Sequence, residues 1–126
     1  MARRAPLRIG VLGAAGAMFT GIHAPCMLHR TQIAGVVEPD EARLAQAQER
    51  LHAFGPLENY DSLADLLSHE KPDALLVATP PAFHAEALLE CLDAGIPCFV
   101  EKPVAITLDE CDRLHAAAAA SSVPVF

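Results

Sequence analysis

The sequence predicts an α/β fold, a doubly wound parallel sheet covered by helices on both faces in three αβα layers. Short apolar runs alternate along the chain with segments whose apolar residues recur at helical spacing, which is the pattern of repeated βα units. The run at residues 74–78 is continuously apolar, as a strand buried on both faces should be. With 126 residues, 52% of them hydrophobic, the chain is long enough for one domain core and too short for two ordinary domains.

The predicted strands are short apolar runs that end at Gly, Pro or polar residues. They cover residues 7–12, 33–37, 57–60, 74–78, 97–100 and 123–126. The run at 57–60 is the weakest, and the run at 123–126 resembles a strand that is just beginning. In a parallel sheet, the carboxyl ends of such strands gather at one edge, where folds of this class bind their ligands.

Helices are predicted between these runs. The first follows a loop rich in Gly and Ala and runs to about His29, and Pro25 should distort it because proline removes a backbone hydrogen bond. In the second, apolar residues recur at three-to-four spacing until Gly55-Pro56 stops the helix. These apolar residues are Leu44, Ala47, Leu51 and Phe54.

Sequence signals also mark the remaining helices. Ser62 and Thr107 each precede an acidic residue by three positions, which predicts a capping arrangement at the start of the helix that follows. Another helix is predicted over residues 82–93 and ends at Gly95. The last helix should continue through residues 116–120, because this segment consists of alanine, the strongest helix former.

Composition excludes several classes of protein. The formal net charge is -7, whereas a nucleic-acid-binding surface needs a basic face. The apolar stretches are too short to span a membrane, and the N-terminal segment lacks the apolar region of a signal peptide. We therefore expect a cytoplasmic protein that binds neither nucleic acid nor membrane.

The cysteines and histidines predict no metal site. The four cysteines are scattered without a C-x-x-C pair, and the six histidines occur singly. This distribution favours reduced, buried thiols over a disulfide framework or a zinc site.

A turn of small residues follows the first predicted strand. Gly13-Ala14-Ala15-Gly16 lets backbone N–H groups and the start of the next helix approach a pyrophosphate. The spacing departs from G-x-G-x-x-G, because Ala15 and Met18 occupy the second and third glycine positions. A tight turn that binds no ligand would have the same composition, so the turn alone leaves both readings open.

Glu38 ends the second predicted strand, slightly more than 20 residues after the glycine turn. An acidic residue at this point can accept hydrogen bonds from both ribose hydroxyls of an adenosine, and it would repel a 2'-phosphate. NAD is therefore favoured over NADP. Arg43 lies close enough in sequence to keep NADP as an alternative, and a solvated strand end would also explain Glu38.

Glu101-Lys102-Pro103, after the fifth predicted strand, and the segment 78–84, Ala-Thr-Pro-Pro-Ala-Phe-His, carry the most specific pattern. Together they resemble the Gfo/Idh/MocA oxidoreductase family, and the resemblance extends in order over nearly the whole chain. The other matching segments are the strand at residues 8–11, the glycine turn, His23-Ala24-Pro25, the segment 36–40 and Ala94-Gly95.

The resemblance implies that residues 1–126 are a Rossmann-type NAD(P)-binding domain of a two-domain oxidoreductase. Such enzymes oxidise a sugar or cyclitol hydroxyl, or reduce the matching ketone. The C-terminal domain of the family, which supplies the substrate pocket and a sheet used for oligomerisation, is expected to be absent from this chain. We expect the parent protein to be a homo-oligomer and the chain alone to bind dinucleotide without turnover.

The resemblance also assigns candidate site residues. Lys102 matches the family lysine that faces nicotinamide and substrate, and an ammonium there would stabilise a developing alkoxide. His84 would lie beside the nicotinamide as a second catalytic candidate, although a capping or packing role is equally open. Thr79 and Pro80 would shape the ribose pocket, and Glu101 is a candidate cofactor-binding residue. His23 is expected to be structural, and the Lys102–Pro103 bond is a candidate cis peptide.

Other functions remain as alternatives. A non-catalytic nucleotide-binding or ligand-sensing module would need the same glycine turn and Glu38 but no second domain. A receiver-type signalling domain also has a lysine-proline pair after its fifth strand. Receivers need carboxylates after the first strand and an Asp after the third, where this chain has Gly13-Ala14 and Thr79-Pro80. The receiver reading is therefore discounted.

Overall fold

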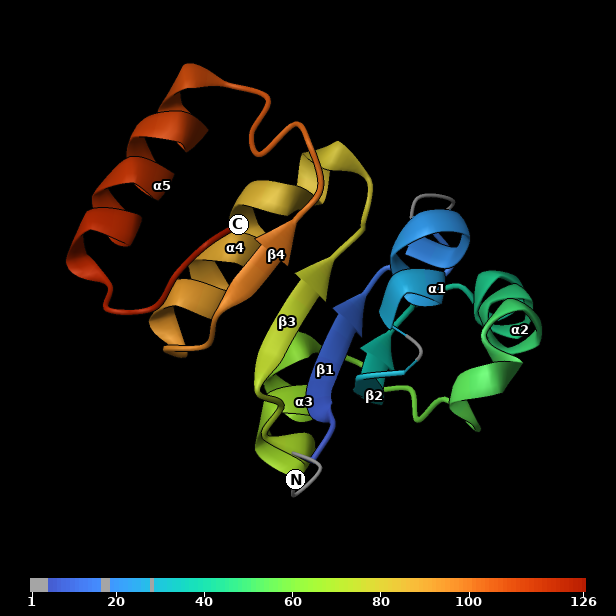
Figure 1. The fold of residues 1–126 in the computed structure, drawn as a ribbon. Helices are drawn as coiled ribbons and strands as arrows, with labels where there is room; N and C mark the ends of the chain where they lie inside the picture. The colour runs from blue at the N-terminus through green and yellow to red at the C-terminus, as the bar shows by residue number, and fades with distance from the viewer. Residues whose placement is uncertain (1–4, 17–18, 28) are drawn as a thin grey trace.

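The computed structural model describes residues 5–16, 19–27 and 29–126. They form a parallel four-stranded sheet in the order β2-β1-β3-β4 (Figure 1). The strands are β1 (Leu7–Leu12), β2 (Thr31–Val37), β3 (Ala74–Val77) and β4 (Cys98–Val100). The chain order reverses between β1 and β3, which is where a doubly wound sheet opens a crevice for ligands.

Two further segments extend the sheet by single parallel bridges. Asn59 pairs with Val36 beside β2, and Val125 pairs with Cys98 beside β4. The predicted strands at 57–60 and 123–126 therefore lie where expected, but they form bridges and not full ladders. Pro56 and Pro124 stand in or next to these segments and cannot donate to a ladder.

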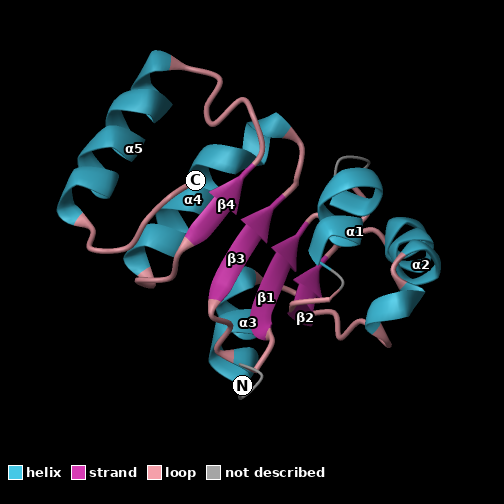
Figure 2. Cartoon of the chain, in the orientation of Figure 1, coloured by secondary structure: helices cyan, strands magenta, loops and turns pink. Residues whose placement is uncertain are grey.

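Helices flank the sheet on both sides (Figure 2). They are α1 (Ala24–Met27), α2 (Glu41–Arg50), α3 (Leu63–Glu70), α4 (His84–Asp93) and α5 (Leu108–Ala120). A π-helical turn (Phe19–His23) precedes α1, and short 3-10 turns follow α2 (His52–Phe54) and precede α4 (Pro81–Phe83). None of the helices among the described residues is long and apolar enough to cross a membrane.

The predicted distortion at Pro25 is confirmed. The segment before β2 forms one π-helical turn and then one α-helical turn that includes Pro25, because proline has no N–H for the ladder. Residues 17, 18 and 28 of the predicted helix lie outside the described residues.

The predicted capping arrangements at the starts of α3 and α5 are confirmed as well. The Ser62 hydroxyl accepts from the backbone N–H of Asp65, and Thr107 forms a full capping box with Glu110. The sequence analysis missed a third cap, in which the Asp40 carboxylate accepts from the N–H of Arg43 at the start of α2. These caps satisfy N–H groups that the first helical turn leaves without partners.

Side chains alternate between the two faces of the sheet. On one face, Leu12, Leu75 and Val77 pack with buried residues of α3, α4 and α5. On the other face, Val11 and Leu76 pack with the segment 19–24 and with α2. The predicted three-layer arrangement is therefore confirmed. The prediction of buried thiols is wrong for two of the four free cysteines, since Cys26 and Cys111 are exposed and only Cys91 and Cys98 are buried.

Candidate dinucleotide-binding site

The carboxyl ends of the strands point to one edge of the sheet (Figure 1). A cavity of about 470 Å³ opens there between the ends of β1, β2 and β3 and the start of α4. The predicted residues Gly13, Glu38, Thr79 and Pro80 all line this cavity. The folded chain thus brings together residues from three separate strand ends, as the sequence analysis expected.

The glycine turn packs directly against the end of β3. Gly13 has a φ of +78°, and a Cβ there would lie 2.7 Å from the Thr79 backbone nitrogen. A Cβ on Gly16 would lie 2.8 Å from the Ala78 carbonyl oxygen. The Gly16 N–H donates to the Gly13 carbonyl at 3.1 Å and closes the turn. Ala14 is buried and Ala15 is partly buried, so only small residues fit along this turn.

Glu38 is only 4% exposed, and the Asn59 side chain holds its backbone. The Glu38 N–H donates to Asn59 Oδ1 at 3.0 Å, and Asn59 Nδ2 donates to the Glu38 carbonyl at 3.2 Å. Sequence reasoning missed Asn59, whose only signal was its place in the weak apolar run beside the second strand. These two bonds fix the point at which the Glu38 side chain enters the cavity.

The Glu38 carboxylate keeps capacity to accept hydrogen bonds. Its Oε1 accepts from the Asp40 N–H at 3.3 Å, and its Oε2 lies 3.8 Å from Arg43 Nε at the rim. A carboxylate has about four lone-pair sites. The group can therefore accept further hydrogen bonds from a pair of ligand hydroxyls.

Thr79 presents a second unsatisfied group at the cavity. Its hydroxyl oxygen is buried and has no hydrogen-bond partner among the described residues. A buried hydroxyl without a partner is unfavourable. A polar ligand in the cavity would supply the missing partner.

The segment Glu101-Lys102-Pro103, called the lysine loop below, leaves β4 at the same edge. The Glu101 N–H donates to the Val77 carbonyl at 3.1 Å, which ties the loop to β3. The Glu101 carboxylate pairs with the imidazole of His23, and this hydrogen bond lowers the pKa of Glu101 below its usual range. The Lys102 side chain is exposed, and the Lys102–Pro103 bond is cis, as predicted.

His84, the first residue of α4, is 1% exposed and lies between two loops. Its Nδ1 is 2.7 Å from the Pro103 carbonyl oxygen, and its Nε2 is 2.7 Å from the Thr79 carbonyl oxygen. The ring thus connects the lysine loop to the end of β3.

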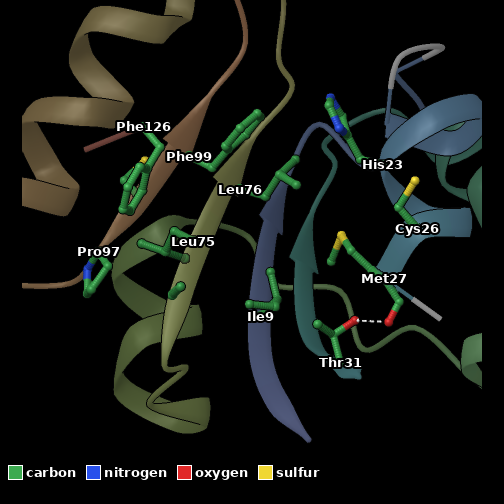
Figure 3. Close-up of a pocket in the computed structure, with 12 residues that line it drawn as sticks. Ile9, His23, Cys26, Met27, Thr31, Leu75, Leu76, Pro97, Phe99 and Phe126 are labelled. Carbon is green, nitrogen blue, oxygen red and sulfur yellow. Dashed lines mark hydrogen bonds between the residues drawn. The ribbon is translucent and has the colours of Figure 1, made fainter. Parts of the chain in front are cut away.

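A second hollow, called the apolar groove below, lies over the sheet on the side of His23 and Phe99 (Figure 3). It has a volume of about 310 Å³. Figure 3 shows Ile9, Leu76 and Phe126 lining it together with Phe99. These apolar side chains offer little to a charged dinucleotide, unlike the lining of the cavity at the strand ends.

Known proteins resemble the chain over nearly its whole length. A family model described as an oxidoreductase family with an NAD-binding Rossmann fold matches residues 7–126. An inositol 2-dehydrogenase of Corynebacterium glutamicum is 39% identical over 101 residues, which are 78% of this chain and 28% of that protein. A D-glucoside 3-dehydrogenase of Escherichia coli is 34% identical over 105 residues, which are 83% of this chain and 29% of that protein.

Solved structures agree with these relatives. The WlbA dehydrogenase of Bordetella pertussis, in complex with NADH and UDP-GlcNAcA, has a TM-score of 0.79 and 26% identity, covering 96% of this chain and 36% of that one. A 3-ketoreductase of Actinomadura kijaniata, in complex with NADP and TDP-benzene, has a TM-score of 0.76 and 26% identity, covering 95% and 36%. The chain spans well under half the length of each of these proteins.

The ion pair between His23 and Glu101 predicts a measurable acid dependence of stability. Because the pKa of Glu101 is lowered in the folded chain, its contribution is present above about pH 4.5 and is lost as the pH falls through the lowered pKa. We expect Glu101→Gln to lose less unfolding free energy than the wild type between about pH 5 and about pH 3. Urea unfolding followed by circular dichroism at several pH values measures this difference.

Glu86→Gln is the matched control, since Glu86 pairs with Arg113 but is 64% exposed. Exposed pairs contribute little to stability, so this variant should follow the pH dependence of the wild type. The same acid slope for Glu101→Gln and wild type would contradict the prediction.

Proposed function

This chain belongs to the Gfo/Idh/MocA oxidoreductase family and corresponds to the NAD-binding Rossmann domain of that family. We propose that it binds NAD(H) in preference to NADP(H). The observation that carries this preference is the buried Glu38 carboxylate, which lines the same cavity as Gly13 and Thr79. A carboxylate here would accept hydrogen bonds from the two ribose hydroxyls of the adenosine and would repel a 2'-phosphate.

We propose the remaining contacts of NAD(H) from the shape of the cavity and the chemistry of its lining residues. The turn from Gly13 to Gly16 would hold the pyrophosphate, because its residues are all glycine or alanine and Gly13 lines the cavity. Thr79 and Pro80 would flank the ribose on the nicotinamide side, where the Thr79 hydroxyl gains a partner. Arg43 is half-exposed at the rim and neutralises part of the Glu38 charge.

We further propose that the protein containing this chain transfers hydride between nicotinamide and a sugar or cyclitol hydroxyl. The relatives named as inositol and D-glucoside dehydrogenases support this substrate class. When bound, NAD supplies the hydride acceptor. Lys102 stands at the end of β4 with an exposed ammonium, which would stabilise the alkoxide that develops as the substrate hydroxyl loses its proton. We place this reaction in the cytoplasm, where thiols such as the free cysteines stay reduced.

The apolar groove supports a proposal about assembly. Phe126 is 71% exposed and Phe99 is 41% exposed, and both line the groove. Contiguous exposed apolar surface favours association. We propose that a second copy of the chain covers the groove, so that the 126-residue chain self-associates.

Cofactor preference is the first test of these proposals. Glu38→Ala removes hydrogen bonds that ligand hydroxyls would donate to a charged group, and the loss of one such bond costs about 1.5–3 kcal/mol. We expect NAD affinity to fall by roughly 10- to 100-fold and the preference over NADP to disappear, as measured by isothermal titration calorimetry.

Glu49→Ala is the control, because Glu49 is an exposed residue of α2 outside the cavity. It should leave the affinities for both dinucleotides unchanged. Tighter binding of NADP than of NAD by the wild type, or an unchanged NAD affinity of Glu38→Ala, would refute the role given to Glu38.

The role of Lys102 separates binding from chemistry. In the protein that joins this chain to a substrate domain, Lys102→Ala should lower kcat by roughly 10²- to 10³-fold and leave the Kd for NAD nearly intact. The 126-residue chain alone should show no turnover with a panel of sugars and cyclitols, because Lys102 is exposed and lines neither of the two cavities described above.

Lys71→Ala is the matched control for Lys102→Ala. Lys71 is exposed and ends α3 just before β3, at the opposite edge of the sheet. Equal losses of kcat in the two variants, or turnover by the chain alone, would overturn the assignment.

Self-association is tested by analytical ultracentrifugation. Phe126→Glu places a charge in the apolar groove and should shift the chain toward monomer, whereas Leu108→Glu, at a residue of α5 that is 84% exposed, should not. A wild-type chain that stays monomeric across a wide concentration range would refute the proposal.

A further inference from the structure

A histidine contacts the residue on each side of Lys102. The Glu101 carboxylate pairs with His23, and the Pro103 carbonyl lies 2.7 Å from His84 Nδ1. Among the described residues, by contrast, no hydrogen bond or ion pair fixes the Lys102 ammonium itself. The position of that ammonium relative to the cavity is therefore set by the backbone of the lysine loop.

We propose that His84 is a positioning residue that fixes the lysine loop to the wall of the cofactor cavity, in place of the catalytic role predicted from the sequence. This inference rests on the proposed function of Lys102. His84 acts through the backbone on both sides and does not reach the substrate.

The surroundings of His84 support positioning over proton transfer. Both ring nitrogens lie 2.7 Å from backbone carbonyl oxygens, and the residue is 1% exposed. A carbonyl oxygen only accepts, so each contact is a hydrogen bond when the ring nitrogen that faces it carries the hydrogen. A ring bound in this way has no nitrogen left to exchange a proton with a substrate hydroxyl.

The two carbonyls belong to segments whose separation matters for the chemistry. The Thr79 carbonyl stands at the end of β3, where the Thr79 backbone also contacts the glycine turn. The Pro103 carbonyl directly follows Lys102. His84 thus links the lysine loop to the same strand end that supports the cofactor site. Because displacement of a reacting group by about 1 Å can lower the rate on the order of 100-fold, this link controls how well Lys102 is aligned.

Two conservative variants distinguish the two contacts. The side-chain amide nitrogen of asparagine can replace Nδ1 of histidine, whereas that of glutamine can replace Nε2. His84→Asn should therefore keep the bond to the Pro103 carbonyl, and His84→Gln should keep only the bond to the Thr79 carbonyl. His84→Leu removes both bonds. His52→Leu is the control, because His52 is exposed and its ring contacts the Glu49 carbonyl three residues away, far from the lysine loop in sequence.

The first measurement uses the 126-residue chain and needs no substrate. Backbone NMR should show the amide signals of Lys102 and Val104 displaced in His84→Leu and His84→Gln, and close to wild type in His84→Asn and His52→Leu. NAD affinity, measured in parallel by calorimetry, should stay within about threefold of wild type. If the wild-type chain did not bind NAD, the proposed function would be refuted. If a folded His84→Leu variant kept the wild-type amide signals of Lys102 and Val104, the positioning role of His84 would be refuted.

The second measurement uses the protein with its substrate domain. We expect His84→Leu and His84→Gln to lower kcat by roughly 100-fold with little change in the KM for NAD, and His84→Asn to recover most of that loss. Melting temperatures are recorded for every variant. A loss of kcat that follows the melting temperature alone, equal in His84→Asn and His84→Gln, would show a merely structural role and overturn the proposal.

Discussion

The close contact between the glycine turn and the end of β3 is the constraint on which the rest of the site depends. A Cβ at Gly13 or Gly16 would come within 2.8 Å of the backbone of Ala78 or Thr79, so the two strand ends meet without intervening side chains. Gly13 and Thr79 line the cavity together with Glu38. The contact also accounts for glycine at these two positions even when no ligand is considered, because the close packing of backbone against backbone already requires it.

The same strand end connects the cofactor site to the lysine loop. The Val77 carbonyl accepts from the Glu101 N–H, and the Thr79 carbonyl faces His84. The end of β3 therefore contacts both the glycine turn and the lysine loop. β3 pairs with β1 and β4 along its two edges, and its side chains are buried in the core clusters on both faces. A buried strand is a rigid support for groups that must be aligned.

Local geometry, not net charge, explains how an acidic chain accommodates an anionic dinucleotide. The chain carries a formal charge of -7, which opposes a polyanion at long range. Screening by salt limits such repulsion to about 10 Å at ordinary ionic strength, whereas the backbone N–H groups of a glycine turn act at contact distance. In the function proposed above, the buried Glu38 carboxylate would repel the 2'-phosphate of NADP.

The sequence by itself determined the order of strands and helices, the caps at Ser62 and Thr107, and the candidates Gly13 and Glu38, because each depends on local periodicity or on a strand end. The candidate Thr79 came from the resemblance to the family. Only the tertiary structure showed the hydrogen-bond partners of Asn59, His23 and His84. Asn59 meets Glu38, and His23 meets Glu101, across long stretches of chain. The ring of His84 has two bound nitrogens only because the loops after β3 and β4 come together around it. A hydrogen bond between residues far apart in sequence leaves no periodic signal, and only the packing of the strands brings its partners within reach.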